Sequence, residues 1–324
     1  MTVKVIKPGL LTTVQDLGRT GAMRFGFARS GAMDPLAAAA ANALLGQDID
    51  SPLLECTLIG PVLEFDCDSI IAISGAQTHA TLDGAPIALG APVSVAAGQR
   101  LDLGRTHIGA RSYLAFKGGL QLSPLLGSCA TQLNVGLGGH QGRALRKEDS
   151  LSIRPCRLAE EFRQSSWLGL ASPGVNTIAV FAGPVSAGFN GEAMEALLAQ
   201  PWRVSSASDR MGYRLQGAKV PSPSGKRLGL TEPVIPGTIQ LPGNGEPIVL
   251  MSDSQPTGGY PKLAQVAAVD LPLLAQLAPG DYCQFITCTL EQANHMRWQQ
   301  QRQLNRMRAA AQRRWQEISW SYST

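Results

Sequence analysis

Charged residues are scarce in this sequence: Asp, Glu, Lys and Arg together make up 16% of its 324 residues, against about a quarter in typical globular proteins. Hydrophobic residues make up 44%. A chain with so little charge and so many apolar side chains is not disordered, and we expect a folded body with much buried surface. Its length favours two domains over one.

Long apolar runs are also missing. None reaches the roughly 18 residues that a membrane-spanning helix needs, and the longest candidate, Pro35–Leu45, is an Ala-rich stretch that stops at Gly46. The first residues, Met1–Val5, lead into Pro8 without the apolar region of a signal peptide. We therefore expect a cytoplasmic protein with no membrane contact.

Cysteine pairs with the spacing of a metal or disulfide site are absent. No CxxC pair occurs, and in a long cytoplasmic chain such dispersed cysteines are expected to be free thiols, mostly buried. We therefore predict neither a structural zinc site nor any other metal site. The six cysteines are Cys56, Cys67, Cys129, Cys156, Cys283 and Cys288.

The common catalytic signatures are lacking. Gly225-Lys226 has no upstream glycine and is followed by Arg227, so there is no phosphate-binding loop. The glycines from Gly136 to Gly142 do not have dinucleotide-binding spacing, and neither HExxH nor GxSxG occurs. The chain thus shows no ATP site of its own. Four isolated histidines are interpreted as surface or hydrogen-bonded structural residues: His79, His107, His140 and His295.

The net charge of +4 belongs to one tail. Six of the 28 basic residues and two of the 24 acidic residues lie between Glu291 and Thr324, so the remaining chain carries 22 of each. A neutral body has no electrostatic footprint for nucleic acid, and we expect no nucleic-acid partner.

Short strands separated by turns are what the sequence does contain. From Pro52 to Leu120, apolar or alternating runs are punctuated by Gly, Asp and Pro, a spacing typical of a barrel or a sandwich. One helix is clearly signalled before them, with Asp34 as N-cap and Gly46 after its end. The predicted strands are Leu53–Leu58, Val62–Phe65, Ile70–Ser74, His79–Leu82, Val93–Val95 and Arg111–Phe116.

The second half repeats this character. A strand at Thr177–Phe181 and a helix near Gly191–Gln200 are predicted, with more strands up to Phe285. The resulting domains are an N-terminal β lobe (1–156), a connection (157–176), a C-terminal β lobe (177–288) and a helical tail (289–324).

The tail is predicted to be one long helix with an apolar face. We favour packing of this face on the body; docking to a partner, or contact with nucleic acid or membrane, are the alternatives. The apolar positions are Ala293, Met296, Leu304, Met307, Ala311, Trp315 and Ile318, interrupted by Gln300.

Four polar, glycine-flanked segments stand out among the turns. Glycine lets the backbone approach a ligand closely, Arg offers a fork suited to carboxylates, and Asp, Gln, Tyr and Lys supply donors and acceptors for amide chemistry. Any one of these segments alone is more simply interpreted as a turn. The segments are 12–19 with 30–34, 127–131 with 138–143, 208–215 and 251–262.

Taken in order, these segments and their neighbours resemble the allophanate-hydrolase-subunit-2 family, whose members include C subunits of bacterial 5-oxoprolinase and the carboxyltransferase region of urea amidolyases. The resemblance covers about residues 4–290. The phrases that carry it are PGLLTTVQDLGRTG (8–21), SGAMDPLA (30–37), LECTLIGP (54–61), IAISGA (71–76), ARSYLAFKGGL (110–120), LGSCATQLNVGLGGHQGR (126–143), SDRMGYRLQG (208–217), PGTIQLPGNGEPIVLMSDSQPTGGYPK (236–262) and DLPLLAQLAPGD (270–281).

The resemblance implies a mainly β, two-lobed architecture of cyclophilin-like β-barrel domains with a few helices and a C-terminal helix. It also implies membership of an ATP-dependent 5-oxoprolinase, which hydrolyses 5-oxo-L-proline to L-glutamate together with B and A subunits. ATP would act through the complex, and this chain would be inactive or weak alone. Two departures bear on this expectation: Leu230–Ile235 differs from relatives at a pocket edge, and Gly31–Asp34 has Asp where a biotinylated Lys would be needed, so we expect no attached biotin.

The site hypothesis places segments 208–215 and 251–262 opposite the first segment across a cleft. Arg210 and Arg214 would bind a carboxylate, and a buried ion pair between Arg210 and Asp209 is the structural alternative. Catalytic roles, orienting the amide or water and stabilising negative charge, are assigned to Asp253, Gln255, Tyr260 and Lys262. The further substrate-binding or cleft-shaping residues are Gly258, Gly259, Gln15, Asp16 and Arg19.

Two other function classes remain open. One is a carboxyltransferase-like component of a biotin-dependent urea- or amide-degrading system. The other is a regulatory protein that binds a kinase inhibitor and needs no catalytic cleft.

Overall fold

The computed structural model describes residues 1–156, 176–181, 191–221 and 231–320. The chain divides into two compact units, and neither is one continuous stretch of sequence. The first contains Met1–Gly18, Asp34–Ser172 and Gln301–Thr324; the second contains Arg19–Met33 and Pro173–Gln300. Nearly all of the predicted connection (157–176) lies outside the described residues.

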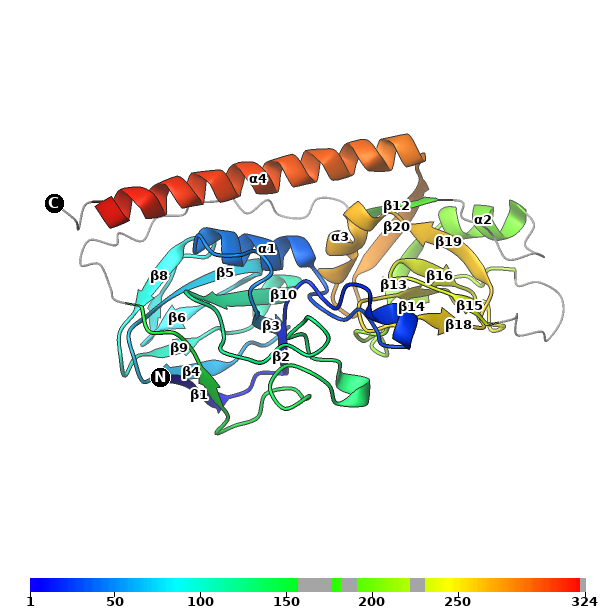
Figure 1. Ribbon diagram of the computed structural model, residues 1–324. Helices are drawn as coiled ribbons and strands as arrows, with labels where there is room; N and C mark the ends of the chain where they lie inside the picture. Colours follow the sequence, from blue (N-terminus) through cyan, green and yellow to red (C-terminus); the bar gives the residue numbers. More distant parts are fainter. Residues whose placement is uncertain (157–175, 182–190, 222–230, 321–324) are drawn as a thin grey trace. The chain divides into compact units, whose positions relative to one another are not determined.

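Two antiparallel sheets form the first unit (Figure 1). One has the strand order β11-β1-β4-β9-β6-β7 and the other β2-β3-β10-β5-β8. Their bounds are β1 (Thr2–Lys7), β2 (Leu11–Gln15), β3 (Leu53–Thr57), β4 (Val62–Phe65), β5 (Ser69–Thr78), β6 (Thr81–Leu82), β7 (Ala85–Pro86), β8 (Pro92–Val95), β9 (Arg100–Asp102), β10 (Thr106–Phe116) and β11 (Ser150–Ser152).

The alternating strand residues explain why these sheets pack face to face. Side chains of both sheets belong to one buried cluster, in which the rings of Phe65 on β4 and Phe116 on β10 lie 6.2 Å apart. Because side chains alternate between the faces of a strand, Leu54 and Cys56 of β3 and Leu114 and Phe116 of β10 enter this core. The first unit is therefore the sandwich that the sequence left open.

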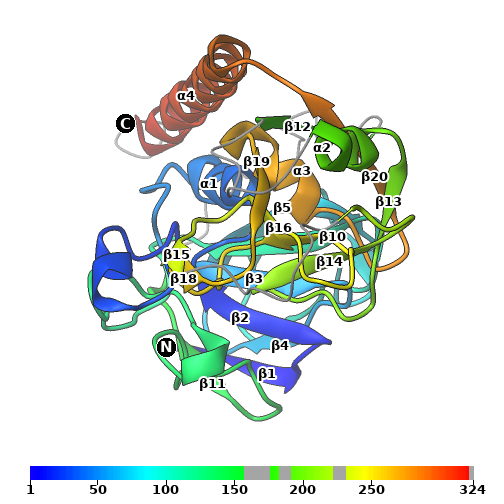
Figure 2. The same cartoon turned by 90° about the vertical axis from the view of Figure 1, so that its right-hand side faces the viewer.

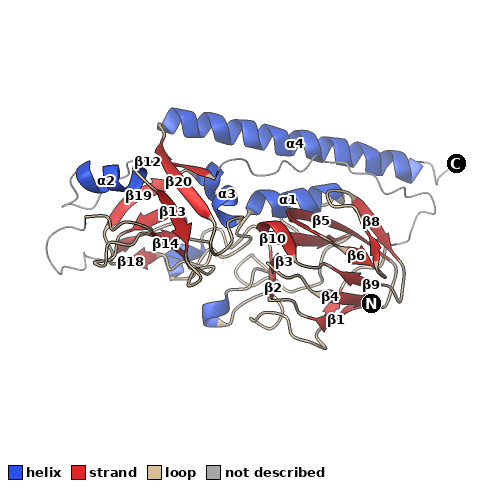
Figure 3. Cartoon of the chain, turned by 180° about the vertical axis from the view of Figure 1, so that it is seen from behind, coloured by secondary structure: helices blue, strands red, loops and turns tan. Residues whose placement is uncertain are grey.

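Helix α1 (Pro35–Leu44) covers the other face of the five-stranded sheet, over β5 and β10 (Figures 2 and 3). The predicted N-cap is confirmed: the Asp34 carboxylate accepts a hydrogen bond from the backbone N–H of Ala37 at 2.9 Å. The Ser74 hydroxyl donates to the Ala37 carbonyl at 2.6 Å. The small alanine side chains allow this close approach of helix and sheet. A short 3-10 helix, η2 (Leu133–Val135), lies in the loop before β11.

A closed seven-stranded barrel forms the second unit (Figure 1), with the order β12-β19-β16-β17-β14-β13-β20. Parallel pairing of β12 with β20 closes it. The strands are β12 (Thr177–Phe181), β13 (Pro201–Val204), β14 (Gly212–Gln216), β16 (Thr238–Gln240), β17 (Ile248–Leu250), β19 (Lys262–Val266) and β20 (Tyr282–Thr287), with a separate ribbon of β15 (Glu232–Pro233) and β18 (Thr257–Gly258).

The barrel core is filled mainly by strand side chains, with residues of α2 and α3 packed against them. Trp202 is fully buried, and its indole N–H donates to the Leu197 carbonyl of α2 at 2.8 Å, so the large ring loses no hydrogen bond on burial. The helices are η1 (Ala22–Phe25), α2 (Gly191–Leu198), η3 (Ala268–Asp270) and α3 (Leu271–Ala275).

Helix α4 (Leu290–Trp320) confirms the predicted C-terminal helix. Ala293 packs in a small cluster with Val269, while Leu304 and Ala311 are buried further along. Gln300, which interrupts the apolar face, donates to the Val269 carbonyl at 3.3 Å. The apolar face therefore packs on the body, as the favoured interpretation predicted. No helix among the described residues, α4 included, has both the length and the apolar character needed to cross a membrane.

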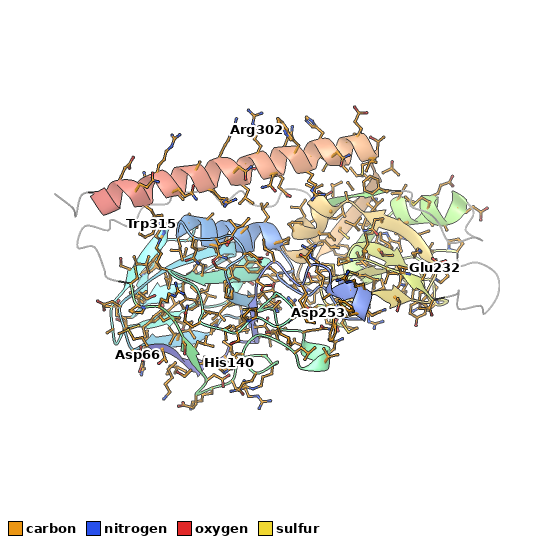
Figure 4. The ribbon with its side chains drawn as sticks, in the orientation of Figure 1. Asp66, His140, Glu232, Asp253, Arg302 and Trp315 are labelled. Carbon is orange, nitrogen blue, oxygen red and sulfur yellow. The ribbon has the colours of Figure 1, made fainter. Side chains whose placement is uncertain are left out.

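Trp315 anchors the later part of α4 within the first unit (Figure 4). Its indole N–H donates to the Leu44 carbonyl at 2.9 Å, and the Lys117 ammonium lies 3.9 Å from the ring centroid. Lys117 also donates to the Leu45 carbonyl, so both groups satisfy carbonyls at the end of α1. Gly46 makes room for the ring, since a Cβ there would lie 2.6 Å from Cδ1 of Trp315.

We expect Trp315→Ala to lower the free energy of unfolding by about 2–3 kcal/mol, because it removes a packed ring, a hydrogen bond and a cation–π contact together. Urea denaturation of the whole chain measures this. Trp298→Ala, at a position 56% exposed on the same helix, is the matched control, and its expected change is within about 0.5 kcal/mol. Equal effects at the two positions would contradict the anchor.

Candidate functional site

Arg210 and Asp253 form a buried ion pair in the second unit. The guanidinium donates from Nε to Oδ2 at 2.9 Å and from Nη2 to Oδ1 at 3.1 Å, and both side chains are almost inaccessible to solvent. Nη2 also donates to the Gly31 carbonyl at 2.7 Å. The two residues were predicted to act separately, one on a carboxylate and one on an amide or water. The structure pairs them with each other.

Asp209 is not the partner of Arg210, so the predicted ion pair between these neighbours is wrong. The exposed Asp209 carboxylate accepts from the backbone N–H groups of Met211 and Gly212 at 2.8 and 3.1 Å, which closes the turn before β14. Adjacent side chains at a tight turn diverge, whereas Asp253 reaches Arg210 from another loop. Arg210 therefore does form a buried ion pair, but with Asp253 and not with Asp209.

Three polar stretches meet around this pair. The backbone N–H of Asp253 donates to the Arg210 carbonyl at 2.9 Å, and that of Ser30 donates to the Ser252 carbonyl at 2.9 Å. Ser252 in turn donates to the Ala32 carbonyl at 3.3 Å. Residues 30–33 thus contact the segments 208–215 and 251–262 inside one unit. Residues 12–18 belong to the other unit and have their own contacts.

Lys262 lies at the start of β19 and forms an ion pair with Glu232 at 2.5 Å. Glu232 lies on β15, whose register places it opposite Gly258 of β18. A Cβ at Gly258 would lie 2.6 Å from Nε2 of the buried Gln240, so a larger residue there would displace the end of that side chain. The Lys262 ammonium and the Glu232 carboxylate remain partly open to solvent.

The other predicted site residues of the second unit are more accessible. Gln255 and Tyr260 are exposed, Gly259 is half-buried, and Arg214 points outward from β14. These side chains can reach a ligand, whereas the Arg210 and Asp253 side chains are buried and bonded to each other. Arg19, also in this unit, is fully buried, and its backbone N–H donates to the Arg29 carbonyl.

Asp16 and Gln15 lie in the first unit and contact the second polar segment there. The Asp16 carboxylate accepts from the Ser128 hydroxyl at 2.7 Å, from the Gly18 N–H at 2.8 Å and from the Cys129 N–H at 2.5 Å. Gln15 donates to the Thr131 carbonyl. Asp16 therefore holds two loops of the first unit together.

A buried polar pair that the sequence did not predict joins two strands of the five-stranded sheet. Tyr113 on β10 donates to Oε2 of Glu55 on β3 at 2.8 Å and accepts from the Asp34 N–H at 2.8 Å. Burial, and next the Glu55 carboxylate, raise the pKa of Tyr113 well above its usual range. The signal was present: Glu55 interrupts an otherwise apolar strand, and a buried acid in a strand needs a partner.

Another cluster of charged side chains lies at the end of the glycine-rich loop 138–143. Arg143 donates to both oxygens of Asp149 at 2.7 and 2.8 Å, and His140 Nε2 lies 3.5 Å from Oδ1. These hydrogen bonds lower the pKa of Asp149 from 3.8 to about 2.

A carboxyl whose pKa is lower in the folded state contributes stability above its unfolded pKa and loses it as the pH falls through the folded pKa. We therefore expect the free energy of unfolding of wild type to exceed that of Asp149→Asn by about 1–2 kcal/mol at neutral pH. This difference should disappear as the pH falls from about 4 to about 2. Urea titrations across this range measure it. Arg143→Gln should give the same pH dependence, and a difference that persists at pH 2 would contradict the pairing.

These arrangements provide carboxylate- and amide-binding groups but no metal site: among the described residues, no group of three or more His, Cys, Asp or Glu side chains could hold a metal ion. An exposed Arg, a half-open Lys–Glu pair and an accessible Tyr leave polar groups of the second unit open to solvent.

A family model and several known proteins match this chain. A family model described as "Carboxyltransferase domain, subdomain A and B" matches residues 25–287. The C subunit of the 5-oxoprolinase of Escherichia coli is 41% identical over 304 residues, covering 93% of this chain and 96% of the relative; that of Haemophilus influenzae is 36% identical, covering 91% and 94%.

A solved structure, the urea amidolyase of K. lactis, superposes with a TM-score of 0.85 at 32% identity and covers 94% of this chain. This chain spans 20% of the length of that amidolyase. The family match covers most of the sequence, and the two 5-oxoprolinase relatives align along nearly their whole length. The chain therefore belongs to the family of carboxyltransferase domains with subdomains A and B.

Proposed function

We propose that this chain is the C subunit of an ATP-dependent 5-oxoprolinase that hydrolyses 5-oxo-L-proline to L-glutamate in the cytoplasm, together with B and A subunits. The observation that carries the proposal is 41% identity to the C subunit of a 5-oxoprolinase over nearly the whole of both chains. The lack of a phosphate-binding motif in the sequence supports ATP acting through the complex and a chain that is inactive or weak alone.

In this proposal the accessible groups of the second unit contact the substrate. Arg214 binds its carboxylate, and Gln255 and Tyr260 orient the amide and the attacking water. Water adds to the ring carbonyl, the C–N bond breaks, and the ring nitrogen takes a proton to become the amino group of glutamate. The Lys262 ammonium stabilises the negative charge that develops on the carbonyl oxygen.

The buried pair plays a different part. Arg210 and Asp253 position the loops that carry these groups, because Arg210 bonds to Gly31 and Asp253 bonds back to the Arg210 backbone. Gly258 and Gly259 let the backbone approach the ligand, and Glu232 fixes the Lys262 ammonium. Asp16 keeps its shaping role in the first unit, and we assign Arg19 a similar one in the second.

One alternative is a carboxyltransferase-like component that takes a carboxyl group from biotin carried on another chain. The superposition with a urea amidolyase favours it. In that case bicarbonate and a biotin carrier, not 5-oxoproline, would be needed for turnover.

Reconstitution tests the proposal. Glutamate release from 5-oxoproline and ATP is measured with this chain and candidate A and B subunits, leaving out each in turn. We expect release only from the full mixture, and loss when this chain is omitted. A correctly assembled mixture that releases no glutamate would refute the proposal. Carboxyl transfer in the presence of a biotin carrier would then favour the carboxyltransferase, and binding without turnover would favour the regulatory protein.

A further inference from the structure

The ion pair between Lys262 and Glu232 joins two separate sheets of the second unit and is open to solvent. Glu232, labelled in Figure 4, lies on β15 of the two-stranded ribbon, and Lys262 is the first residue of the barrel strand β19. Nζ of Lys262 lies 2.5 Å from Oε2 of Glu232, and the two side chains are 22% and 47% exposed. A dissolved ligand can therefore reach both charges.

Backbone pairing holds each end of this ion pair in place. Glu232 lies opposite Gly258 in the ribbon, and Lys262 lies opposite Gln240 of β16 in the barrel. The buried Gln240 also touches the ribbon, since a Cβ at Gly258 would lie 2.6 Å from its Nε2. We call these four residues of the second unit the ribbon corner. Its charges are positioned before a ligand arrives, which lowers the ordering cost of binding.

The charge balance of the ribbon corner decides which ligand groups suit it. The ammonium of Lys262 and the carboxylate of Glu232 together carry no net charge. An ammonium group has three N–H donors, so Lys262 can bond to Glu232 and also to a neutral carbonyl oxygen. A ligand carboxylate bound to the same ammonium would lie beside the Glu232 carboxylate and be repelled by it.

Under the proposed function, the ligand group at Lys262 changes its charge during the reaction. In 5-oxoproline it is the neutral carbonyl oxygen of the ring. Hydrolysis joins the oxygen of water to the carbonyl carbon and breaks the C–N bond, and both hydrogens of water end on the nitrogen, which becomes an ammonium group. The carbonyl has then become the γ-carboxylate of glutamate, while the α-carboxylate is unchanged. A negative charge therefore appears next to Glu232.

We propose that Glu232 makes the ribbon corner selective for a neutral amide oxygen over a carboxylate, so that the lactam is held and the product glutamate is released. This inference rests on the proposed function and adds a specificity-determining residue to it. Glu232 does not touch the reacting atoms and acts through Lys262. A Glu232 that only tied the ribbon to the barrel would affect the binding of neutral and charged ligands alike.

Substitution of Glu232 by Gln tests the selectivity, because it removes the charge but keeps an oxygen that can accept from Lys262. The affinities of 5-oxo-L-proline, L-glutamate and L-glutamine are measured by NMR titration of the assembled complex without ATP. Glutamine has the shape of glutamate and a neutral γ-amide. Glu232→Gln is expected to bind glutamate about five- to tenfold more tightly than wild type does. Its affinities for glutamine and 5-oxoproline should change less than about twofold.

Two further variants serve as controls. Glu232→Asp keeps the negative charge and should keep most of the preference for neutral ligands. Glu195→Gln removes an exposed carboxylate from α2 of the same unit and should leave the affinities for all three ligands unchanged.

Equal changes for glutamate and glutamine in Glu232→Gln, or no tighter binding of glutamate, would overturn the inference. So would a wild-type complex that binds none of the three ligands. If the reconstituted mixture releases glutamate while Glu232→Gln leaves the preference unchanged, the inference fails and the proposed function stands. Selective tightening for glutamate in a mixture that releases none keeps the selectivity of the ribbon corner and refutes the oxoprolinase function.

Discussion

Arg210→Ala is expected to destabilise the chain by about 3–5 kcal/mol, because it leaves the Asp253 carboxylate buried without its counter-ion. The loss should appear as a lower urea midpoint and, in the reconstituted complex, as reduced glutamate release that follows the folded fraction. Both oxygens of Asp253 are used by Arg210, and the guanidinium also holds the Gly31 carbonyl. One substitution therefore removes three hydrogen bonds from the interior.

A double variant tests whether the charges of Arg210 and Asp253 are needed for stability. Arg210→Met with Asp253→Leu removes both charges, and such replacements of buried ion pairs are often neutral or stabilising. We expect it to recover most of the lost stability. Arg214→Ala, on the exposed face of the same segment, should change stability by less than about 0.5 kcal/mol. A folded but inactive Arg210→Ala protein would instead show that Arg210 contacts substrate.

Asp16→Ala is expected to lower the free energy of unfolding by about 3–5 kcal/mol. The substitution leaves the Gly18 N–H, the Ser128 hydroxyl and the Cys129 N–H without their acceptor. Urea denaturation measures the change. These three donors come from two loops more than a hundred residues apart in sequence, so the variant should also loosen the loop that carries Ser128 and Cys129. Faster amide hydrogen exchange in residues 126–143 would show this.

Asp50→Ala provides the comparison. The exposed Asp50 carboxylate accepts from the Leu17 N–H at 2.7 Å, next to Asp16 but at the surface, where water can replace it. We expect Asp50→Ala to lower the free energy of unfolding by no more than about 1 kcal/mol. If Asp16→Ala is as mild as Asp50→Ala, and yet substrate binding is lost, then Asp16 acts on the ligand and not on the loops.

Local signals predicted the elements well. The Asp34 cap, the proline after it and the alanine run gave α1 to within a residue, and the strands Val62–Phe65 and Thr177–Phe181 have the predicted bounds. The apolar positions of α4 gave a helix whose face packs on the body. Each of these features depends on residues a few positions apart, and sequence spacing reports such contacts directly.

Long-range pairing was harder to predict. The structural alternative paired Arg210 with the adjacent acid, but its partner Asp253 is 43 residues away, and the ion pair between Lys262 and Glu232 was not predicted. Nothing in the local pattern of Arg19–Met33 distinguishes it from a loop of the first unit, yet it belongs to the second. Charges and loops find such partners through the tertiary fold. The roles assigned to Gln255, Tyr260 and Lys262 remain proposals.

The division of the chain among the units has a consequence for synthesis. The second unit needs Arg19–Met33, made early, and β20, made after residue 281, while the first unit needs Trp315 near the C-terminus. On the ribosome, then, neither unit can be completed as a nascent domain before almost the whole chain has emerged. A gene cut at residue 156 would yield two fragments that each lack a piece of their own fold.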